Sequence, residues 1–148
     1  MMKKALVVVA HGSRREASNE EVRALAERLA QLPDNDYDSV TAAFLELAEP
    51  LIPDGVVQAI DAGAQEVVVL PYFLSAGRHV ASDIPAEVDK AVSRRPDARI
   101  RIAPYVGSMD SMTDLMMRTA GTRYCKDNPD CKLGEKAGPF TVCTGECD

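Results

Sequence analysis

The sequence predicts an α/β fold of three layers, in which helices cover both faces of a four-stranded parallel sheet. Short apolar runs rich in β-branched residues alternate with longer stretches of helical periodicity, and this alternation is typical of parallel sheets. The first and third of these runs are almost continuously apolar, as expected of strands that are buried on both faces.

The first half of the chain predicts two strands and two helices. Residues 5–10 (ALVVVA) form the first strand, and apolar side chains at helical spacing up to Leu29 predict the helix after it. Two overlapping capping boxes, beginning at Ser13 and at Ser18, leave the start of this helix open by a few residues. The stretch "SVTAAFLEL" predicts a second strand, and the next helix is expected to begin near Pro53 and to stop at Gly63.

The second half repeats the alternation. A third strand is predicted in "EVVVLPYFL", and a helix capped by Ser82 or Asp83 is predicted over residues 80–95. The inward face of this helix is expected to carry Ile84, Val88, Ala91 and Val92. An edge strand in "ARIRIAPYV" and a last helix in "DSMTDLMMRTA" follow. The apolar residues of that helix, expected to fill the core or an interface, are Met109, Met112, Leu115 and Met116.

Composition bounds the domain organisation. At 148 residues the chain has the length of one domain, but its composition changes after Gly121. The remaining stretch is charged, contains glycine and proline, and holds all four cysteines. We therefore predict a folded domain at residues 1–121 and a cysteine-containing extension at residues 122–148.

Charge and hydropathy exclude several classes of partner. A formal net charge of −6 argues against a general nucleic-acid binder and against a polybasic membrane-surface protein. The apolar run at residues 5–10 is shorter than the roughly 7–15 residues of a signal peptide, and no stretch approaches the roughly 18 apolar residues of a membrane span. We therefore expect a cytoplasmic protein with neither a nucleic-acid nor a membrane partner.

Both histidines of the chain follow predicted strands. His11 comes directly after the first strand, and His79 lies a few residues beyond the third. Because parallel strands end at the same edge of a sheet, the two imidazoles are expected to share that edge with Glu46 and Glu49 from the end of the second strand. Imidazole with carboxylate suits a borderline divalent metal ion, and imidazole also accepts protons near neutral pH.

Residues suited to binding carboxylate or phosphate groups surround this set, with two glycines that allow a close backbone approach. They are Ser13, Arg14, Arg15, Ser75 and Arg78, together with Gly12 and Gly77. A single histidine at a strand end is more often structural than a ligand, and the two neighbouring arginines could be solvated charges at a helix start. Two histidines at one edge, each beside glycine and arginine, favour a functional site.

Three segments carry a resemblance to a known family. "VVVAHGSR", "AFLELAEPLIPDGV" and "VVVLPYFLSAGRHVASDIP" resemble the small sirohydrochlorin chelatases of the CbiX/SirB type, short members of the class II tetrapyrrole chelatases. The resemblance spans about residues 3–120, with the segments in the same order and spacing. It implies a chelatase fold and insertion of a divalent metal ion into sirohydrochlorin without ATP, in cobalamin or siroheme biosynthesis. We expect Co²⁺ ahead of Fe²⁺, with Ni²⁺ possible.

The resemblance also implies roles for individual residues. His11 matches a histidine that accepts protons and binds the metal ion, and His79 matches a second metal-binding histidine. Glu49 matches an acidic position near the substrate, and Glu46 is added from its place at the strand end as a further metal ligand. The residues expected to contact the macrocycle and its carboxylates are Leu74, Ser75, Ala76, Gly77, Arg78, Ser13 and Arg14. A homodimer whose sites face a shared cleft is implied as well.

The cysteines of the extension carry a separate prediction. Cys125, Cys131, Cys143 and Cys147 could hold an iron–sulfur cluster or, less typically, a zinc ion, because grouped thiols inside cells more often bind metal than form structural disulfides. Their thiols could equally stay free or oxidise in pairs.

Two other functions stay open. A non-catalytic metal carrier or sensor would use the same histidines and cysteines without turnover. A histidine-dependent phosphoryl transferase would need an arginine before the histidine, where this chain has Ala10.

Overall fold

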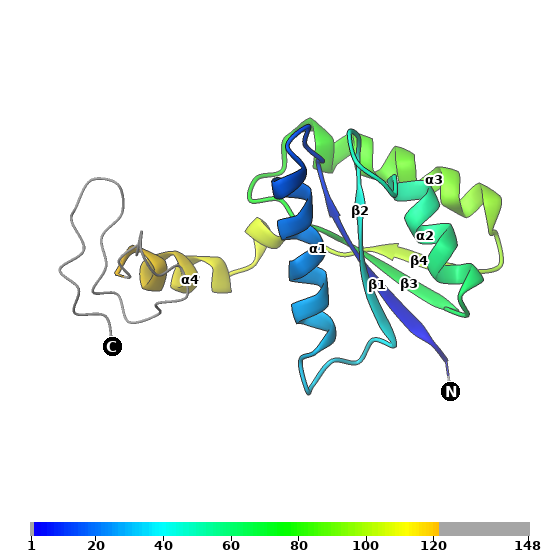
Figure 1. Ribbon diagram of the computed structural model, residues 1–148, viewed down its shortest axis with the longest axis horizontal. Coiled ribbons are helices and arrows are strands. Elements are labelled where there is room, and N and C mark those ends of the chain that lie inside the picture. Colours follow the sequence, from blue (N-terminus) through cyan, green and yellow to red (C-terminus); the bar gives the residue numbers. More distant parts are fainter. Residues whose placement is uncertain (1, 122–148) are drawn as a thin grey trace. The chain divides into compact units, whose positions relative to one another are not determined.

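The computed structural model describes residues 2–121 and contains a four-stranded parallel sheet in the order β2-β1-β3-β4 (Figure 1). The strands are β1 (Lys4–Ala10), β2 (Ser39–Phe44), β3 (Glu66–Pro71) and β4 (Arg99–Ile102). The helices are α1 (Glu16–Ala30), α2 (Ile52–Asp61), α3 (Ile84–Arg94) and α4 (Ser111–Ala120), with a π-turn η1 (His79–Asp83) and a short 3₁₀ turn η2 (Val106–Ser108). The predicted alternation of strands and helices and the predicted parallel sheet, with β4 at one edge, are confirmed.

Helices cover both faces of the sheet because alternate residues of its central strands point to opposite sides. Val7 of β1 packs in a cluster with Val56 of α2 and Val88 of α3, two helices that lie side by side in Figure 1. Val8 points the other way and packs with Ala26 of α1. Both valines are at most 1% exposed, so β1 is buried on both faces, as its uninterrupted apolar sequence predicts.

The register of the sheet brings the carboxyl ends of three strands to one level. Ala10 of β1 pairs with Phe44 of β2, and Val9 pairs with Pro71 of β3. The hydrogen-bond ladder continues past β2, since the N–H of Leu45 donates to the carbonyl of Ala10 at 2.9 Å. Residues that follow β1, β2 and β3 are therefore held at the same edge of the sheet.

The start of α1 differs from both predicted starts. The helix begins at Glu16, and no side chain caps it. The hydroxyl of Ser13 instead accepts a hydrogen bond from the N–H of Arg15 at 3.0 Å, and Ser18 lies inside the helix. Neither capping box forms, because the side chain of Asn19 binds the backbone of this loop, as described below.

The helical segment after β3 begins with η1 at His79, one residue before the predicted start, and α3 itself begins at Ile84. Ser82 and Asp83 do not cap it, since they lie inside the π-turn η1, where the N–H of Ile84 donates to the carbonyl of His79. Pro85, which has no backbone N–H, follows the turn directly. Val92 is 39% exposed, so the inward stripe of α3 consists of Ile84, Val88 and Ala91 alone.

The chain divides into two compact units, the first ending at Ser108 and the second beginning at Met109. Within the second unit, α4 buries none of its residues, and the expectation that its methionines form an interface remains a prediction. The proposed extension at residues 122–148, with its four cysteines, lies outside the described residues, so the predicted cluster or zinc ion remains a prediction too. Across residues 2–121, no helix has the length and apolarity that crossing a membrane would require.

Candidate functional site

The side chain of His11 lies at the end of β1, next to the end of β2. Its Nδ1 is 3.1 Å from the carbonyl oxygen of Gly12, and its Nε2 is 3.2 Å from Oε1 of Glu46. The His11 side chain is 40% exposed, so the ring is mounted on a buried strand while one edge remains accessible. The structure therefore places Glu46, the acidic residue expected from the second strand, beside the first histidine.

His79 reaches the same place from the other side of β1. It is the first residue of η1, and its ring centroid is 4.7 Å from that of His11, with the two planes inclined at 57°. Its Nδ1 lies 2.8 Å from Oδ2 of Asp83. Two imidazoles that are 68 positions apart in the sequence thus share one edge of the sheet, each beside a carboxylate.

The hydrogen-bond partners decide which ring nitrogens carry protons. A backbone carbonyl can only accept, so the carbonyl of Gly12 favours a proton on Nδ1 of His11. Nε2 faces the Glu46 carboxylate, which is also an acceptor when ionised. A cation or a proton between the two would satisfy both. Within residues 2–121 no three His, Cys, Asp or Glu side chains form a ready metal site, so the arrangement consists of two carboxylate–imidazole pairs.

Gly12 holds the ends of β1 and β2 together. Its φ of +92° lies in the region that favours glycine, and a Cβ at this position would be 1.7 Å from the carbonyl oxygen of Glu46. The N–H of Glu46 also donates to the carbonyl of His11 at 3.0 Å. The separation between the His11 ring and the Glu46 carboxylate therefore depends on a backbone contact that only glycine permits.

Asn19 fixes the loop that follows His11, and sequence reasoning missed it. It is 2% exposed; its Oδ1 accepts from the N–H of Ser13 at 2.9 Å, and its Nδ2 donates to the carbonyl of Ser13 at 2.8 Å. The sequence pattern favours the two serines as caps, and the burial of Asn19 becomes visible only in the fold. The loop is thus held by a side chain that satisfies both backbone groups of one residue.

Replacing Asn19 with alanine is expected to destabilise the protein by about 1–3 kcal/mol, because two backbone groups of Ser13 lose their partner. The free energy of unfolding in urea measures this effect. Glu21→Ala, an exposed change on the same helix, is the matched control and should fall within about 0.5 kcal/mol of the parent. Equal stability of the two variants would show that the Asn19 bonds do not hold the loop.

Arg23 ties α1 to the loop between β2 and α2, and it too was not predicted. Its Nη2 donates to the carbonyl of Glu49 at 2.9 Å, and its guanidinium carbon lies 5.1 Å from the ring centroid of Phe44. It also pairs with the carboxylates of Glu16 and Glu20, and its hydrogen bond holds the pKa of Glu16 below the usual value. The loop that carries Glu46 is therefore anchored at its far end.

The predicted substrate loop, residues 74–78, is exposed along its whole length. A Cβ on Gly107 would lie 1.8 Å from the carbonyl oxygen of Leu74, and the N–H of Gly107 donates to Phe73 at 2.9 Å, so the loop rests on the segment after β4. Gly77 has a φ of +48°, but no atom lies within 4 Å of a Cβ placed there. The positive φ by itself favours glycine at this position, and the expected close approach of a ligand to Gly77 remains a prediction. Arg14 and Arg15 are exposed as well.

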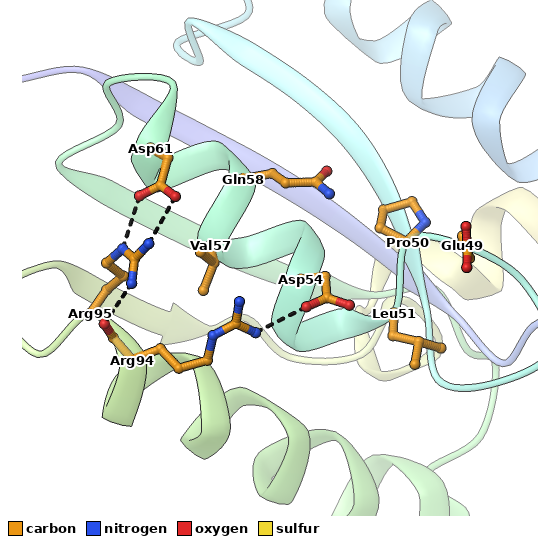
Figure 2. Close-up of a pocket in the computed structure, with 9 residues that line it drawn as sticks. All are labelled: Glu49, Pro50, Leu51, Asp54, Val57, Gln58, Asp61, Arg94 and Arg95. Carbon is orange, nitrogen blue, oxygen red and sulfur yellow. Dashed lines mark hydrogen bonds and ion pairs between the residues drawn. The ribbon is translucent and has the colours of Figure 1, made fainter.

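Glu49 lies apart from the histidine pair. It lines a pocket of about 580 Å³ between the β2–α2 loop, α2 and the end of α3, and neither histidine lines this pocket (Figure 2). The charges there are paired: Arg94 with Asp54 at 2.9 Å, and Arg95 with both carboxylate oxygens of Asp61. The hydrogen bond from Arg95 holds the pKa of Asp61 below its usual value. Neither histidine shares this pocket with Glu49, and the expected contact of Glu49 with the substrate remains a prediction.

Comparison with known proteins shows which family the chain is similar to. The family model described as CbiX matches residues 5–122. The chain is 44% identical over 81 residues to the sirohydrochlorin cobaltochelatase of Methanococcus maripaludis, over 55% of each chain. It is 40% identical over 111 residues to the chloroplastic sirohydrochlorin ferrochelatase of Arabidopsis thaliana, over 75% of this chain and 48% of that one. The chain thus spans about half the length of these curated relatives.

A solved structure shows the same fold. The sirohydrochlorin chelatase SirB from Bacillus subtilis subspecies spizizenii, in complex with cobalt, superposes with a TM-score of 0.70 at 31% identity. The superposition covers 80% of this chain and 50% of that one.

Proposed function

The chain belongs to the CbiX family, and from this premise we propose that it is a chelatase that inserts a divalent metal ion into sirohydrochlorin. The observation that carries the proposal is the pair of imidazoles 4.7 Å apart, with His11 Nε2 lying 3.2 Å from Oε1 of Glu46. A carrier or sensor could use the same groups, but the relatives that match most of this chain are named as chelatases. We propose Co²⁺ as the preferred metal substrate, then Fe²⁺, with Ni²⁺ as a further candidate.

The chemistry of insertion fits these residues. One divalent ion replaces two pyrrole protons, so the charge balances and no oxidant is needed. Insertion without ATP is part of the proposal, as the resemblance implies. Neutral imidazoles of His11 and His79, with the Glu46 carboxylate, would hold the metal substrate while it loses water. As the ion passes to the macrocycle, His11 Nε2 becomes free to accept the two pyrrole protons in turn, and Glu46 at 3.2 Å can take each of them onward to solvent.

The macrocycle would lie against the exposed residues near the two histidines. We propose that Ser13, Arg14 and the loop of residues 74–78, including Arg78, contact sirohydrochlorin, whose peripheral carboxylates suit the two arginines. The position of Glu49 in the separate pocket of Figure 2 does not support the substrate contact that the resemblance implies. A homodimer, with a second copy closing over the ring, remains part of the proposal.

The test is a metal-insertion assay. Sirohydrochlorin is mixed anaerobically with the metal-free protein and Co²⁺, without ATP, and the absorption spectrum of the macrocycle is followed. The rate is expected to exceed the rate without protein and to fall in the order Co²⁺, Fe²⁺, Ni²⁺. Metal binding at an insertion rate equal to the background would instead identify a carrier or sensor.

A further inference from the structure

Asp83 is the partner of His79, and sequence reasoning assigned it only to helix capping. Its Oδ2 lies 2.8 Å from Nδ1 of His79. We propose that Asp83 is a positioning residue: it keeps the proton of His79 on Nδ1, so that Nε2 presents its lone pair to a metal ion. The metal ion in this inference rests on the proposed function, whereas the contact between Asp83 and His79 is independent of it.

The backbone mounts Asp83 rigidly. The next residue, Ile84, is fully buried against the sheet, and its N–H donates to the carbonyl of His79 across the π-turn. This bond spans five residues instead of four, so it links the backbone of His79 directly to that of the buried Ile84. The backbone of Asp83 is therefore held in place, and its carboxylate can orient the His79 ring, whose side chain is 44% exposed.

The two histidines are held in different ways. Nδ1 of His11 bonds to a backbone carbonyl, which no side-chain substitution removes. The ring of His79 has only the Asp83 carboxylate as its hydrogen-bond partner within the described part of the chain. A neutral imidazole freed from such a partner rotates and exchanges its proton between the two nitrogens, so it presents the metal-binding lone pair only part of the time.

Removing Asp83 is therefore expected to weaken metal binding at His79 without unfolding the protein. Partners of this kind typically change metal affinity by about 10–100-fold. The chain has only two histidines, so the ring nitrogen signals of each can be assigned by NMR with the His11→Ala and His79→Ala variants. Zn²⁺ serves as the probe because it is diamagnetic and binds imidazole well. The signals of the His79 ring report binding at that ring alone, so Zn²⁺ bound by any of the four cysteines does not affect the measurement.

In the metal-free full-length protein, the ¹⁵N shifts of His79 are expected to report a proton on Nδ1. Asp83→Ala should give a mixture of both tautomers and a Zn²⁺ dissociation constant at His79 raised about 10–100-fold. Asp83→Asn, which keeps an acceptor oxygen, should restore the single tautomer. Asp89→Ala, an exposed change on α3, is the matched control and should leave both readings unchanged.

The proposal is overturned if Asp83→Ala keeps the Nδ1 proton and binds Zn²⁺ within about twofold of the parent. If the alanine variant does not fold, Asp83→Ser, whose side chain is one atom shorter, gives the same two readings. If Zn²⁺ does not reach His79 even in the parent, the proposed function fails, while the tautomer of the metal-free ring still decides the role of Asp83.

Discussion

Gly12→Ala is expected to disable the site and to destabilise the fold together. The new Cβ would lie 1.7 Å from the Glu46 carbonyl oxygen and 2.9 Å from its carbonyl carbon, so backbone has to move. Backbone strain at a positive φ adds about 1–3 kcal/mol. Because the Glu46 backbone is pushed away, its carboxylate no longer lies 3.2 Å from His11 Nε2. Urea unfolding and the insertion rate measure the two effects.

Gly63→Ala is the matched control for this change. Gly63 also has a positive φ, +119°, but its Cβ would meet only the flexible side chain of Lys3, at 3.6 Å. The control is expected to lose some stability through backbone strain and to keep the insertion rate. A Gly12→Ala protein with the insertion rate of the parent would show that the contact between Gly12 and Glu46 has no part in the chemistry.

His11→Ala is expected to lower the insertion rate by about 10²–10⁴-fold, because the proposed proton acceptor and one metal-binding nitrogen are lost together. Stability should change little, since the ring is partly exposed and its only backbone partner is the carbonyl of Gly12. The initial rate of the spectral change with Co²⁺ measures the loss, and thermal unfolding checks that the variant is folded.

The double variant His11→Ala/His79→Ala makes this test sharper. If the two imidazoles act as one unit, the double variant should be about as slow as the slower single variant, because groups that act together are strongly non-additive. Independent losses that multiply would show that the histidines do not share one metal ion. An insertion rate for His11→Ala equal to that of the parent would exclude the mechanism.

The sheet and the meeting of the histidines could be predicted because both follow from long-range regularities of the sequence. Uninterrupted valine runs indicate strands buried on both faces, and parallel strands end at one edge, so His11 and His79 had to lie near each other. The same logic placed Glu46 beside His11.

Features that depend on competition between local interactions could not be predicted. The serines before α1 match a capping pattern, but Asn19 takes the backbone groups of the loop, and its burial is known only once α1 packs on the sheet. Asp83 lies inside the π-turn that precedes Pro85. It therefore does not form the helix cap expected from the sequence, but bonds to His79. Glu49 lines a pocket with residues of α2 and the end of α3, and its expected contact with the substrate remains a prediction.

The backbone hydrogen bonds between β1 and β2 continue past the ends of both strands, and this has a consequence for the dynamics of the site. The N–H groups of Leu45 and Glu46 donate to the carbonyls of Ala10 and His11. The backbone of His11 and Glu46 is therefore expected to move with the sheet, although both residues follow its strands. Their amide hydrogens should exchange with solvent on the timescale of the strands, more slowly than those of the exposed loop at residues 74–78. The backbone that carries Glu46 is therefore expected to open together with the sheet, and the loop of residues 74–78 to open more readily.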